Sequence, residues 1–423
     1  MAALRTASRP ALTALGVLTA INLLNYLDRY LVPPLVPELE RAMGISHAQA
    51  GWLWPAFMLV YMVAAPVFGS WGDRGSRTRP IALGVTIWSL ATVLSGLARN
   101  YHQLFASRAL VGIGEAACAA IAPALLADYF PASARGRVYA VLNMALPVGA
   151  ALGYALGGSI GHHFGWRAAF FVCGAPGLLL AATVLALPDP PRGAQDAHLG
   201  SRAPRPPAGA AGLVAAAGVY LSLMRRVPYG LLLLGFAAYT FGLGGLGFWM
   251  PTFLEQVRGI SPDTATVGFG AVVIVTGFFG TLAGGWLGDW CLQRSPQGYL
   301  WFSALTTLAA APVAMLALSA PAPLVYYPAI VVAELLLFMS TGPVNAAIAN
   351  MVSPYERASA MALSIFAIHL LGDVPSPPLI GHLAVAGSLA RAVMIVPVAL
   401  AIAGVIWLLC ARTDRRATHP ARA

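Results

Sequence analysis

The chain has 423 residues, of which 59% are hydrophobic and only 9% are charged. A soluble domain carries roughly 25% charged residues, so the composition excludes a soluble protein and predicts an integral membrane protein. The formal net charge of +10 is carried by arginine, since none of the 25 basic residues is lysine. The arginines are placed as membrane topology requires, so the basic balance indicates no nucleic-acid partner.

Hydrophobic runs of around 20 residues recur between short polar breaks, and each is long enough to cross a hydrocarbon core of ~30 Å. We count twelve runs in two sets of six, which predicts an all-α membrane protein with twelve transmembrane helices. The predicted halves are residues 1–188 and residues 228–411. Residues 189–227 are predicted to form a cytoplasmic linker, and residues 412–423 a cytoplasmic tail.

The distribution of arginine predicts the orientation. If both termini are cytoplasmic, eighteen arginines lie inside and five outside, while Arg29 and Arg108 lie in the membrane. Cytoplasmic loops carry such an excess of basic residues. We therefore predict cytoplasmic termini and a multi-pass protein of the plasma membrane, which is the inner membrane in a bacterium. The absence of lysine is typical of GC-rich coding and indicates a bacterial source.

The first predicted span, about residues 11–36, carries a polar stripe. Asn22, Asn25 and Asp28 are spaced three apart and stay near one face of a helix, and Arg29 follows them. This stripe faces the protein interior or, alternatively, forms an interfacial cluster near a helix end. We favour the interior, because the residues beyond it are typical of the outer end of a span: Pro33, Pro34, Pro37, Glu38 and Glu40.

The second predicted span, about residues 49–70, ends in a motif rich in glycine and charge over residues 69–79. In a tight turn that contains alternating Asp and Arg residues, a carboxylate can pair with a helix N-terminus and with guanidinium groups. A related Gly-x-x-Gly-Asp follows the eighth span, so the halves form a parallel repeat. We predict that the two motifs form a latch that holds one face closed, through Gly69, Gly72, Asp73, Arg74, Arg77, Gly285, Gly288 and Asp289.

The fourth predicted span, about residues 103–128, contains Arg108 and Glu115. Seven residues are about two helical turns, so both side chains leave the same face at different depths. A charge near the bilayer centre costs at least ~2.5–3.5 kcal/mol, and such residues almost always face a bundle interior or a water-filled path. The two residues therefore predict a polar cavity. The alternative is a structural ion pair that fixes helix register.

The fifth predicted span, about residues 138–160, carries glycines at every fourth position, at 149, 153, 157 and 161. Small residues at this spacing let helices approach closely. The same stretch reads Gly-x-Ser-x-Gly around Ser159, the pattern of a serine hydrolase. That elbow needs a strand-to-helix turn, which an all-helical chain lacks, so we predict that the protein is not an enzyme.

The second half is less charged. Span seven, about residues 229–254, ends in a glycine-rich stretch with Trp249, which lines the cavity or sits in the interfacial aromatic belt. Span ten carries Glu334, and span eleven carries His369 and Asp373. For each of these three charges, a packing contact is the alternative to a role in the cavity. Pro375, Pro377 and Pro378 predict that the outer half of span eleven is not a regular helix.

The repeat, the twelve spans and the full motif of residues 69–79 resemble the major facilitator superfamily of transporters, whose halves pack around a site at mid-membrane. A narrower resemblance to the Spinster lipid transporters covers nearly the whole chain and is weakest in the linker and the termini. It rests on residues 22–30, 65–69, 108–116, 121–128, 147–149 and 369–373. The second-half motif lacks the basic residues of the first.

The resemblance implies a secondary active transporter that moves a lysophospholipid or a sphingoid phosphate by alternating access, coupled to protons. It adds Asp128 to the latch, where the alternative is a solvated helix end. We hypothesise that protons pass through Asp28 or Glu115 while the substrate competes for Arg108, because protonation of a carboxylate depends on its arginine partner. The predicted proton-coupling residues are Asp28, Glu115, His369 and Asp373, and the predicted substrate-binding residues are Arg108, Asn25, Glu115 and Trp249.

The uneven placement of charge also predicts the substrate. A cavity that is polar in the first half and apolar in the second suits an amphiphile. A proton-driven exporter of hydrophobic drugs fits the same asymmetry and is the alternative, while a channel or structural protein would not need the repeated latch. We expect a monomer that contacts membrane lipids and needs no cofactor or metal, and the four cysteines lack the close spacing of a metal site.

Overall fold

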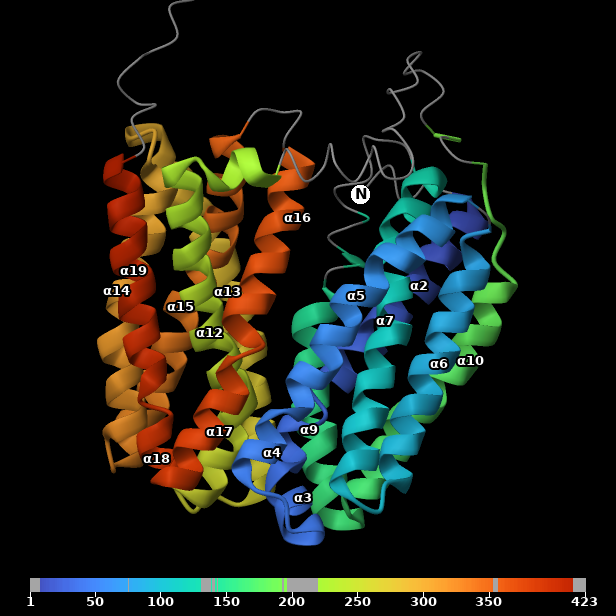
Figure 1. Cartoon of the computed structure of the whole chain (residues 1–423), viewed down its shortest axis with the longest axis horizontal. Coiled ribbons are helices and arrows are strands. Elements are labelled where there is room, and N and C mark those ends of the chain that lie inside the picture. The colour runs from blue at the N-terminus through green and yellow to red at the C-terminus, as the bar shows by residue number, and fades with distance from the viewer. Residues whose placement is uncertain are drawn as a thin grey trace, which may run out of the picture. The chain divides into compact units, whose positions relative to one another are not determined.

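The computed structural model describes residues 8–74, 76–130, 138, 141–142, 144–191, 194–195, 220–352 and 357–413. These residues are almost entirely helical and contain no strand, which confirms the predicted all-α class. The chain forms two compact units, which Figure 1 colours in chain order. The first unit is residues 1–203 with 254–271, and the second is residues 204–253 with 272–423.

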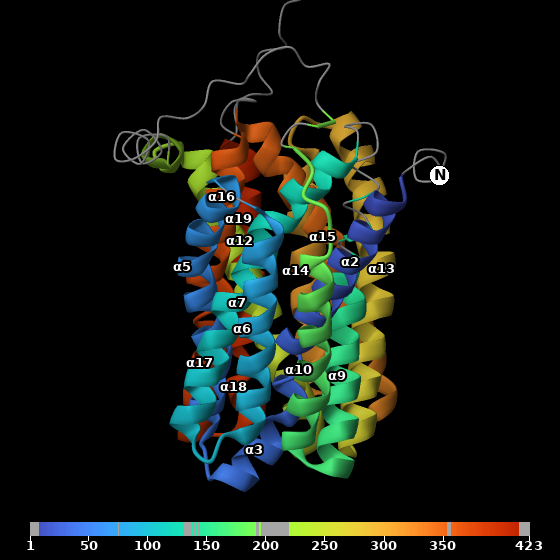
Figure 2. The ribbon, with the colours of Figure 1, turned by 90° about the vertical axis from the view of Figure 1, so that its right-hand side faces the viewer.

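The first unit is built from long helices and a short helical segment near its beginning. They are α2 (Arg9–Arg29), η1 (Pro33–Leu35), α3 (Val36–Met43), α4 (His47–Gly51), α5 (Leu53–Arg74), α6 (Thr78–Leu97), α7 (Tyr101–Tyr129), α9 (Ala145–Phe164) and α10 (Trp166–Leu185). Helix α7 packs against α5, α6 and α2, and α10 packs against α6 and α9. Helices α6 and α7 run side by side in both views (Figure 1, Figure 2).

The second unit takes in most of the remaining helices. They are α12 (Val227–Gln256), α13 (Pro262–Arg294), α14 (Gly298–Ser319), α15 (Pro323–Met351), α16 (Arg357–Ile368), η2 (His369–Asp373), α17 (Ser376–Ala386), α18 (Leu389–Ala392) and α19 (Ile395–Thr413). Helix α14 packs against α15 and α19. The end of α12 and the start of α13 belong to the first unit, whereas the sequence assigns them to the second half. The predicted half boundaries stay a prediction.

Eleven stretches within the described residues are helical, long and apolar enough to cross a membrane. Helix α9, which covers most of the fifth predicted span, is not among them. It has 20 residues, but five are glycine and two are histidine, and neither type adds much hydrophobicity. The count of twelve spans and the cytoplasmic side of both termini therefore stay predictions.

The glycines of α9 allow it to approach α2. A Cβ atom added at Gly149 would lie 2.7 Å from the carbonyl oxygen of Leu23, and one at Gly153 would lie 2.5 Å from that of Leu27. Neither position has room for a side chain, since real Cβ contacts are longer. The repeated glycines thus bring α9 onto the helix that carries the polar stripe, which confirms the expected close approach.

The structure corrects two expectations about helix ends. The first-half motif does not open a turn at Gly69, because α5 continues to Arg74, and residues 285–290 likewise lie inside α13. The second correction concerns span eleven. Its outer half is regular, because Pro377 and Pro378 fall in the first turn of α17, where proline is tolerated. The irregular part is the π-helical turn η2, which precedes them.

Candidate functional site

Helix α7 positions both charges that the sequence singles out in the fourth span. Its first turn is capped by Asn100, whose side chain accepts a hydrogen bond of 3.0 Å from the backbone N–H of Gln103. Arg108 and Glu115 follow on the face that packs toward α2, and both are buried. Their partners are two consecutive residues of α2.

Arg108 pairs with Asp28. Its Nη1 donates to Asp28 Oδ2 at 3.1 Å, and its Nη2 donates to the Asp28 backbone carbonyl at 3.3 Å. The second carboxylate oxygen of Asp28 accepts from the hydroxyl of Thr92 on α6 at 3.1 Å. Both charges are almost completely buried. Three helices therefore meet at this ion pair.

Arg29, the residue after Asp28 on α2, pairs with Glu115 on α7. Its Nε donates to Glu115 Oε2 at 2.9 Å. The guanidinium carbon of Arg29 lies 5.2, 4.9 and 5.0 Å from the ring centres of Tyr26, Phe57 and Tyr61, within the range of cation–π attraction. Three aromatic rings thus hold this arginine in addition to the carboxylate.

This pairing refines the sequence-based expectation. The sequence predicts Asp28 and Glu115 as one carboxylate set around Arg108, but the geometry gives each carboxylate its own arginine. Arg29 is absent from the predicted site residues. The adjacency of Asp28 and Arg29 is the signal that could have found it, since consecutive helical side chains point about 100° apart and serve different partners.

Some hydrogen-bonding capacity of this cluster is unused. Arg108 Nε and Glu115 Oε1 are buried and have no hydrogen-bond partner among the described residues. Asn25 is buried on α2, one turn before Asp28. Asn22 donates to the Leu142 backbone carbonyl at 2.9 Å, so it is occupied. The polar stripe of α2 therefore faces the protein interior, as expected.

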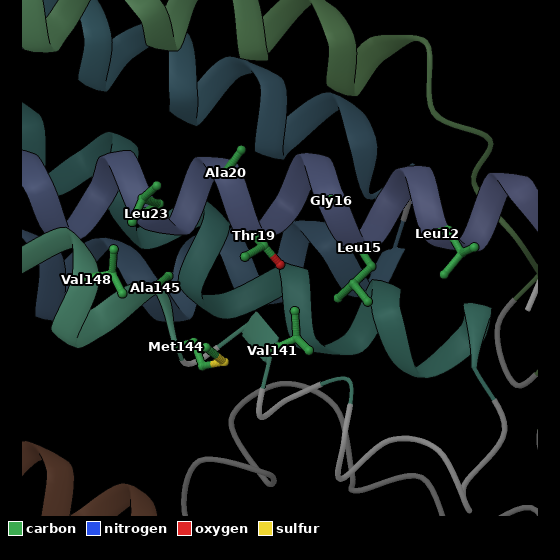
Figure 3. Close-up of a pocket in the computed structure, with 10 residues that line it drawn as sticks. All are labelled: Leu12, Leu15, Gly16, Thr19, Ala20, Leu23, Val141, Met144, Ala145 and Val148. Atoms are coloured by element: carbon green, nitrogen blue, oxygen red, sulfur yellow. The ribbon is translucent and has the colours of Figure 1, made fainter. Parts of the chain in front are cut away.

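An apolar groove runs along the beginning of the same helix (Figure 3). It has a volume of about 520 Å³, and Thr19 supplies the single polar side chain of its lining. It is lined by Leu12, Leu15, Gly16, Thr19, Ala20 and Leu23 of α2 and by Val141, Met144, Ala145 and Val148. From Leu23, α2 rises only about 8 Å to reach Asp28. One helix therefore presents an apolar surface followed by buried charges.

In the second unit, His369 and Asp373 form a pair inside η2. His369 Nδ1 lies 3.0 Å from Asp373 Oδ2, and both side chains are partly exposed. π-Helical turns are rare and occur frequently at functional sites. The two residues are thus brought together as a local pair.

Trp249 has a structural environment in the second unit. Its side chain is fully buried, and its Nε1 donates to the Pro377 carbonyl at 3.0 Å. It therefore fastens α12 to the proline-rich start of α17, and in this arrangement the ring presents no surface to a ligand. Its predicted contact with substrate stays untested.

The predicted latch contains an ion pair that the structure describes, between Arg77 and Asp128. Arg77 also donates through Nε to Asp189 Oδ1 at 2.9 Å, and its backbone N–H donates to Asp189 Oδ2 at 2.7 Å. Burial lowers the pKa of the Arg77 guanidinium, but the two carboxylates outweigh burial and raise it. Asp189 is a partner that sequence reasoning missed, because it opens the predicted linker.

The other latch residues contribute differently. The surroundings of Gly69 and Gly72 and the side chains of Asp73 and Arg74 lie outside the described part of the chain. In the second-half motif, Asp289 accepts a hydrogen bond of 2.6 Å from the hydroxyl of Tyr299. A Cβ at Gly288 would lie 2.7 Å from the Pro343 ring, whereas Gly285 faces open space. The acidic residue of the second-half motif is therefore bound by a neutral hydroxyl, whereas the first-half motif contains the ion pair of Arg77 with Asp128.

Comparison with known families decides the assignment. The model of the Major Facilitator Superfamily matches residues 18–374. The chain belongs to the major facilitator superfamily. Within it, the chain belongs to the Spinster family: it is 35% identical over 388 residues to protein spinster homolog 1 of Bos taurus, covering 87% of this chain and 72% of the relative. This confirms the resemblance drawn from the motifs.

Two further similarities support this Spinster family assignment. The chain is 33% identical over 389 residues to the sphingosine-1-phosphate transporter SPNS2 of Mus musculus, covering 87% of this chain and 69% of that protein. It superposes with a TM-score of 0.85 and 25% identity on the inward-facing, unoccupied crystal structure of a bacterial homolog of the human lysosomal transporter Spinster, over 96% of this chain and 98% of that one.

The family assignment gives the site its general setting. The relatives are transporters, and this Spinster-family chain is an integral multi-pass membrane protein. Ser159 lies inside α9 rather than at a strand-to-helix turn, so the Gly-x-Ser-x-Gly pattern does not form the elbow of a serine hydrolase.

Proposed function

We propose that this transporter moves an amphiphilic lipid, either a lysophospholipid or a sphingoid phosphate, by alternating access coupled to protons. The observation that carries the proposal is the continuity of α2, which lines an apolar groove at residues 12–23 and then holds two paired charges, the buried Asp28 and the partly exposed Arg29. An acyl chain suits the groove, and an anionic head group suits the arginines. The mouse relative is a sphingosine-1-phosphate transporter, which supports the same class of substrate.

The arginines are the proposed anchors for the head group. A guanidinium recognises phosphate through paired N–H donors. Arg108 keeps the predicted role of anion anchor, but its side chain is only 2% exposed, whereas that of Arg29 is 12% exposed. A phosphate therefore reaches Arg29 first and displaces Glu115, and it reaches Arg108 only after Asp28 moves. Asn25 lies beside them on the same buried face.

The carboxylates are the proposed proton carriers. Asp28 and Glu115 each accept a charge-assisted hydrogen bond from an arginine, and such bonds are roughly twice as strong as neutral ones. Protonation of either carboxylate removes its charge and weakens its hold on the arginine, which frees the guanidinium for phosphate. Proton binding and substrate binding are thereby coupled. His369 and Asp373 provide a second proposed proton-sensitive pair in the other unit.

Arg77 is proposed to act as a conformational latch. Its contacts with Asp128 and Asp189 join the start of α6, the end of α7 and the segment after α10. All three positions flank membrane spans, so breaking these contacts releases three helix ends together. The other predicted latch residues, including Asp289, share the proposal through the repeat.

A proton-driven exporter of hydrophobic drugs is the second candidate. The observation in its favour is the lining of the groove, which accepts any apolar molecule because Thr19 is its single polar side chain. A drug of this kind needs no anion anchor, so the two candidates differ in their need for Arg29 and Arg108.

The test uses purified protein in proteoliposomes with an imposed pH gradient. We expect saturable transport of labelled lysophospholipid or sphingoid phosphate, which Asp28→Asn and Glu115→Gln each reduce at least ~100-fold. Glu38→Gln on α3 is the matched control and retains transport, because that carboxylate lies outside the two pairs. Unchanged transport in both cluster variants, or transport of cationic drugs alone, contradicts the proposal.

A further inference from the structure

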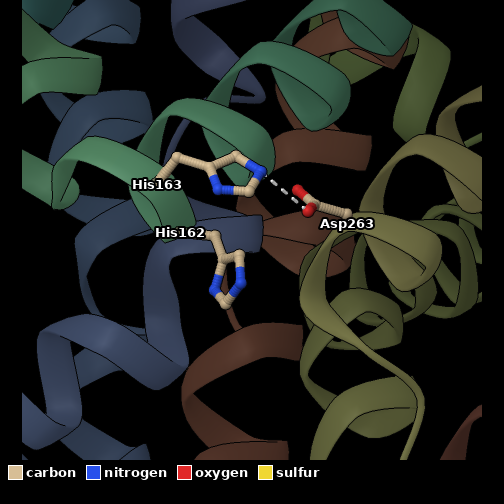
Figure 4. A group of neighbouring side chains, drawn as sticks. All are labelled: His162, His163 and Asp263. Atoms are coloured by element: carbon tan, nitrogen blue, oxygen red, sulfur yellow. Dashed lines mark ion pairs between the residues drawn. The ribbon is translucent and has the colours of Figure 1, made fainter.

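Three side chains that the transport proposal does not use converge at the end of α9. They are His162 and His163, in the last turn of α9, and Asp263, in the first turn of α13 (Figure 4). One donor atom from each lies within 4.8 Å of the other two. All three residues belong to the first unit. This group is independent of the charges on α2 and α7.

The distances resemble those of a metal site before the ion enters. His163 Nε2 lies 3.0 Å from Asp263 Oδ2, and two donors that each bind a tetrahedral zinc ion at ~2.0–2.1 Å are separated by about 3.3 Å. The rings of His162 and His163 have their centres 5.0 Å apart. In Figure 4, the His163 ring points at the Asp263 carboxylate, and the neighbouring His162 ring is turned away from it. Small rotations of two exposed rings suffice to bring the donors to one point.

Asp263 has an oxygen to spare. Its Oδ1 is buried and has no hydrogen-bond partner among the described residues. Burying a carboxylate oxygen without a hydrogen-bond partner destabilises the protein. A metal cation or a histidine N–H removes this cost by binding the oxygen. Because His163 already contacts Oδ2, Oδ1 is the oxygen that is available to coordinate a metal ion.

The surroundings favour a positive ion. Glu38 and Glu255 lie close enough to His162 to interact with it electrostatically, and Glu255 is itself held by Arg41 at 3.3 Å. A Cβ at Gly161 would lie 3.2 Å from Glu38 Oε2, which places that carboxylate against the end of α9. The histidines are exposed, so water has access to the remaining coordination position.

We propose that His162, His163 and Asp263 bind a divalent transition-metal ion, of which zinc fits best. Two imidazoles and one carboxylate form a donor set that suits zinc, and an open fourth position accepts water. The bound ion joins the last turn of α9 to the first turn of α13. The sequence does not reveal this site, because Asp263 lies in a different helix from the histidine pair.

The experiment titrates Zn²⁺ into tag-free, chelator-treated full-length protein by calorimetry, and Co²⁺ by visible absorption. We expect one saturable site with the ligand-field bands of low-coordinate cobalt. Separate His162→Ala, His163→Ala and Asp263→Asn variants each weaken zinc binding at least ~10-fold, as loss of a partner in a metal site typically does. His102→Ala, which removes an exposed histidine outside the group, leaves the affinity unchanged.

Thermal unfolding in the absence of metal shows whether each variant folds. We expect all three variants to fold, because the three side chains are at least partly exposed. The proposal is overturned if the wild type shows no saturable binding or if His102→Ala weakens binding as much as His163→Ala. It is also overturned if Asp263→Asn leaves the affinity unchanged. None of these readouts depends on transport, so the lipid and metal proposals succeed or fail separately.

Discussion

Charges are held differently in the two units. In the first, Arg108 and Glu115 on α7 reach across to consecutive residues of α2, and the two resulting ion pairs are almost entirely buried. In the second, His369 and Asp373 lie four residues apart in one π-helical turn, and both side chains are partly exposed. Changes in the first pairs therefore alter the packing of two helices, while changes in the second pair act on one turn.

The latch motifs show the same contrast. Arg77 in the first unit binds two carboxylates, Asp128 and Asp189, from two other segments. In the second unit, the Asp289 of the corresponding motif accepts a hydrogen bond from the neutral Tyr299 hydroxyl. Contacts in which both partners are charged and which join several segments hold the chain more specifically than one hydrogen bond from a neutral hydroxyl to a carboxylate. We therefore expect the first unit to depend far more on single charged residues.

The largest effect is expected from Arg108→Gln. This change leaves Asp28 buried without its cation, and breaking a buried pair on one side costs about 3–5 kcal/mol. Denaturant unfolding in detergent, monitored by tryptophan fluorescence, measures the loss. The double variant Asp28→Asn/Arg108→Gln is the control and recovers most of the stability, because no uncompensated charge remains. A loss below 1 kcal/mol in the single variant contradicts the comparison.

An intermediate effect is expected from Arg77→Gln. The substitution removes hydrogen bonds between charged groups, each worth about 1.5–3 kcal/mol, although the partial exposure of Asp189 favours the lower end for that contact. The matched change in the second unit is Tyr299→Phe, which removes a bond to a carboxylate at an exposed site and costs about 0.5–1 kcal/mol. Thermal unfolding of both variants measures the difference. Equal losses would show that the two motifs are equivalent.

The smallest effect is expected from Asp373→Asn. Helical i,i+4 pairs at the surface contribute about 0.3–0.5 kcal/mol, and this pair is partly exposed and lies within one turn, so the melting temperature in detergent should change little. Glu115→Gln, measured in the same way, provides the buried counterpart and should lower stability several times more. If Asp373→Asn destabilises the protein as strongly as Glu115→Gln, the second pair is not the local contact that its geometry indicates.

Sequence reasoning located the buried charges of α2 and α7 but not their partners. The polar stripe of α2 and the charges of α7 follow from helical periodicity and from the cost of a charge in lipid, and both are local properties. The partner of each charge depends on how α2 and α7 cross, so the pairing of Arg29 with Glu115 and the role of Asp189 were missed. The regular start of α17 was also missed, because proline breaks a helix only beyond its first turn.

What the sequence by itself determined is the class of the protein. Composition and hydrophobic run length specify a helical, multi-pass membrane protein, because the bilayer leaves few alternatives for such a chain. The repeated motifs resemble those of the major facilitator superfamily, to which the chain belongs. Only the tertiary structure decided which charges meet, where an apolar groove adjoins them, and that His162 and His163 face Asp263. These features depend on packing between distant helices, and periodicity along one helix does not record its neighbours.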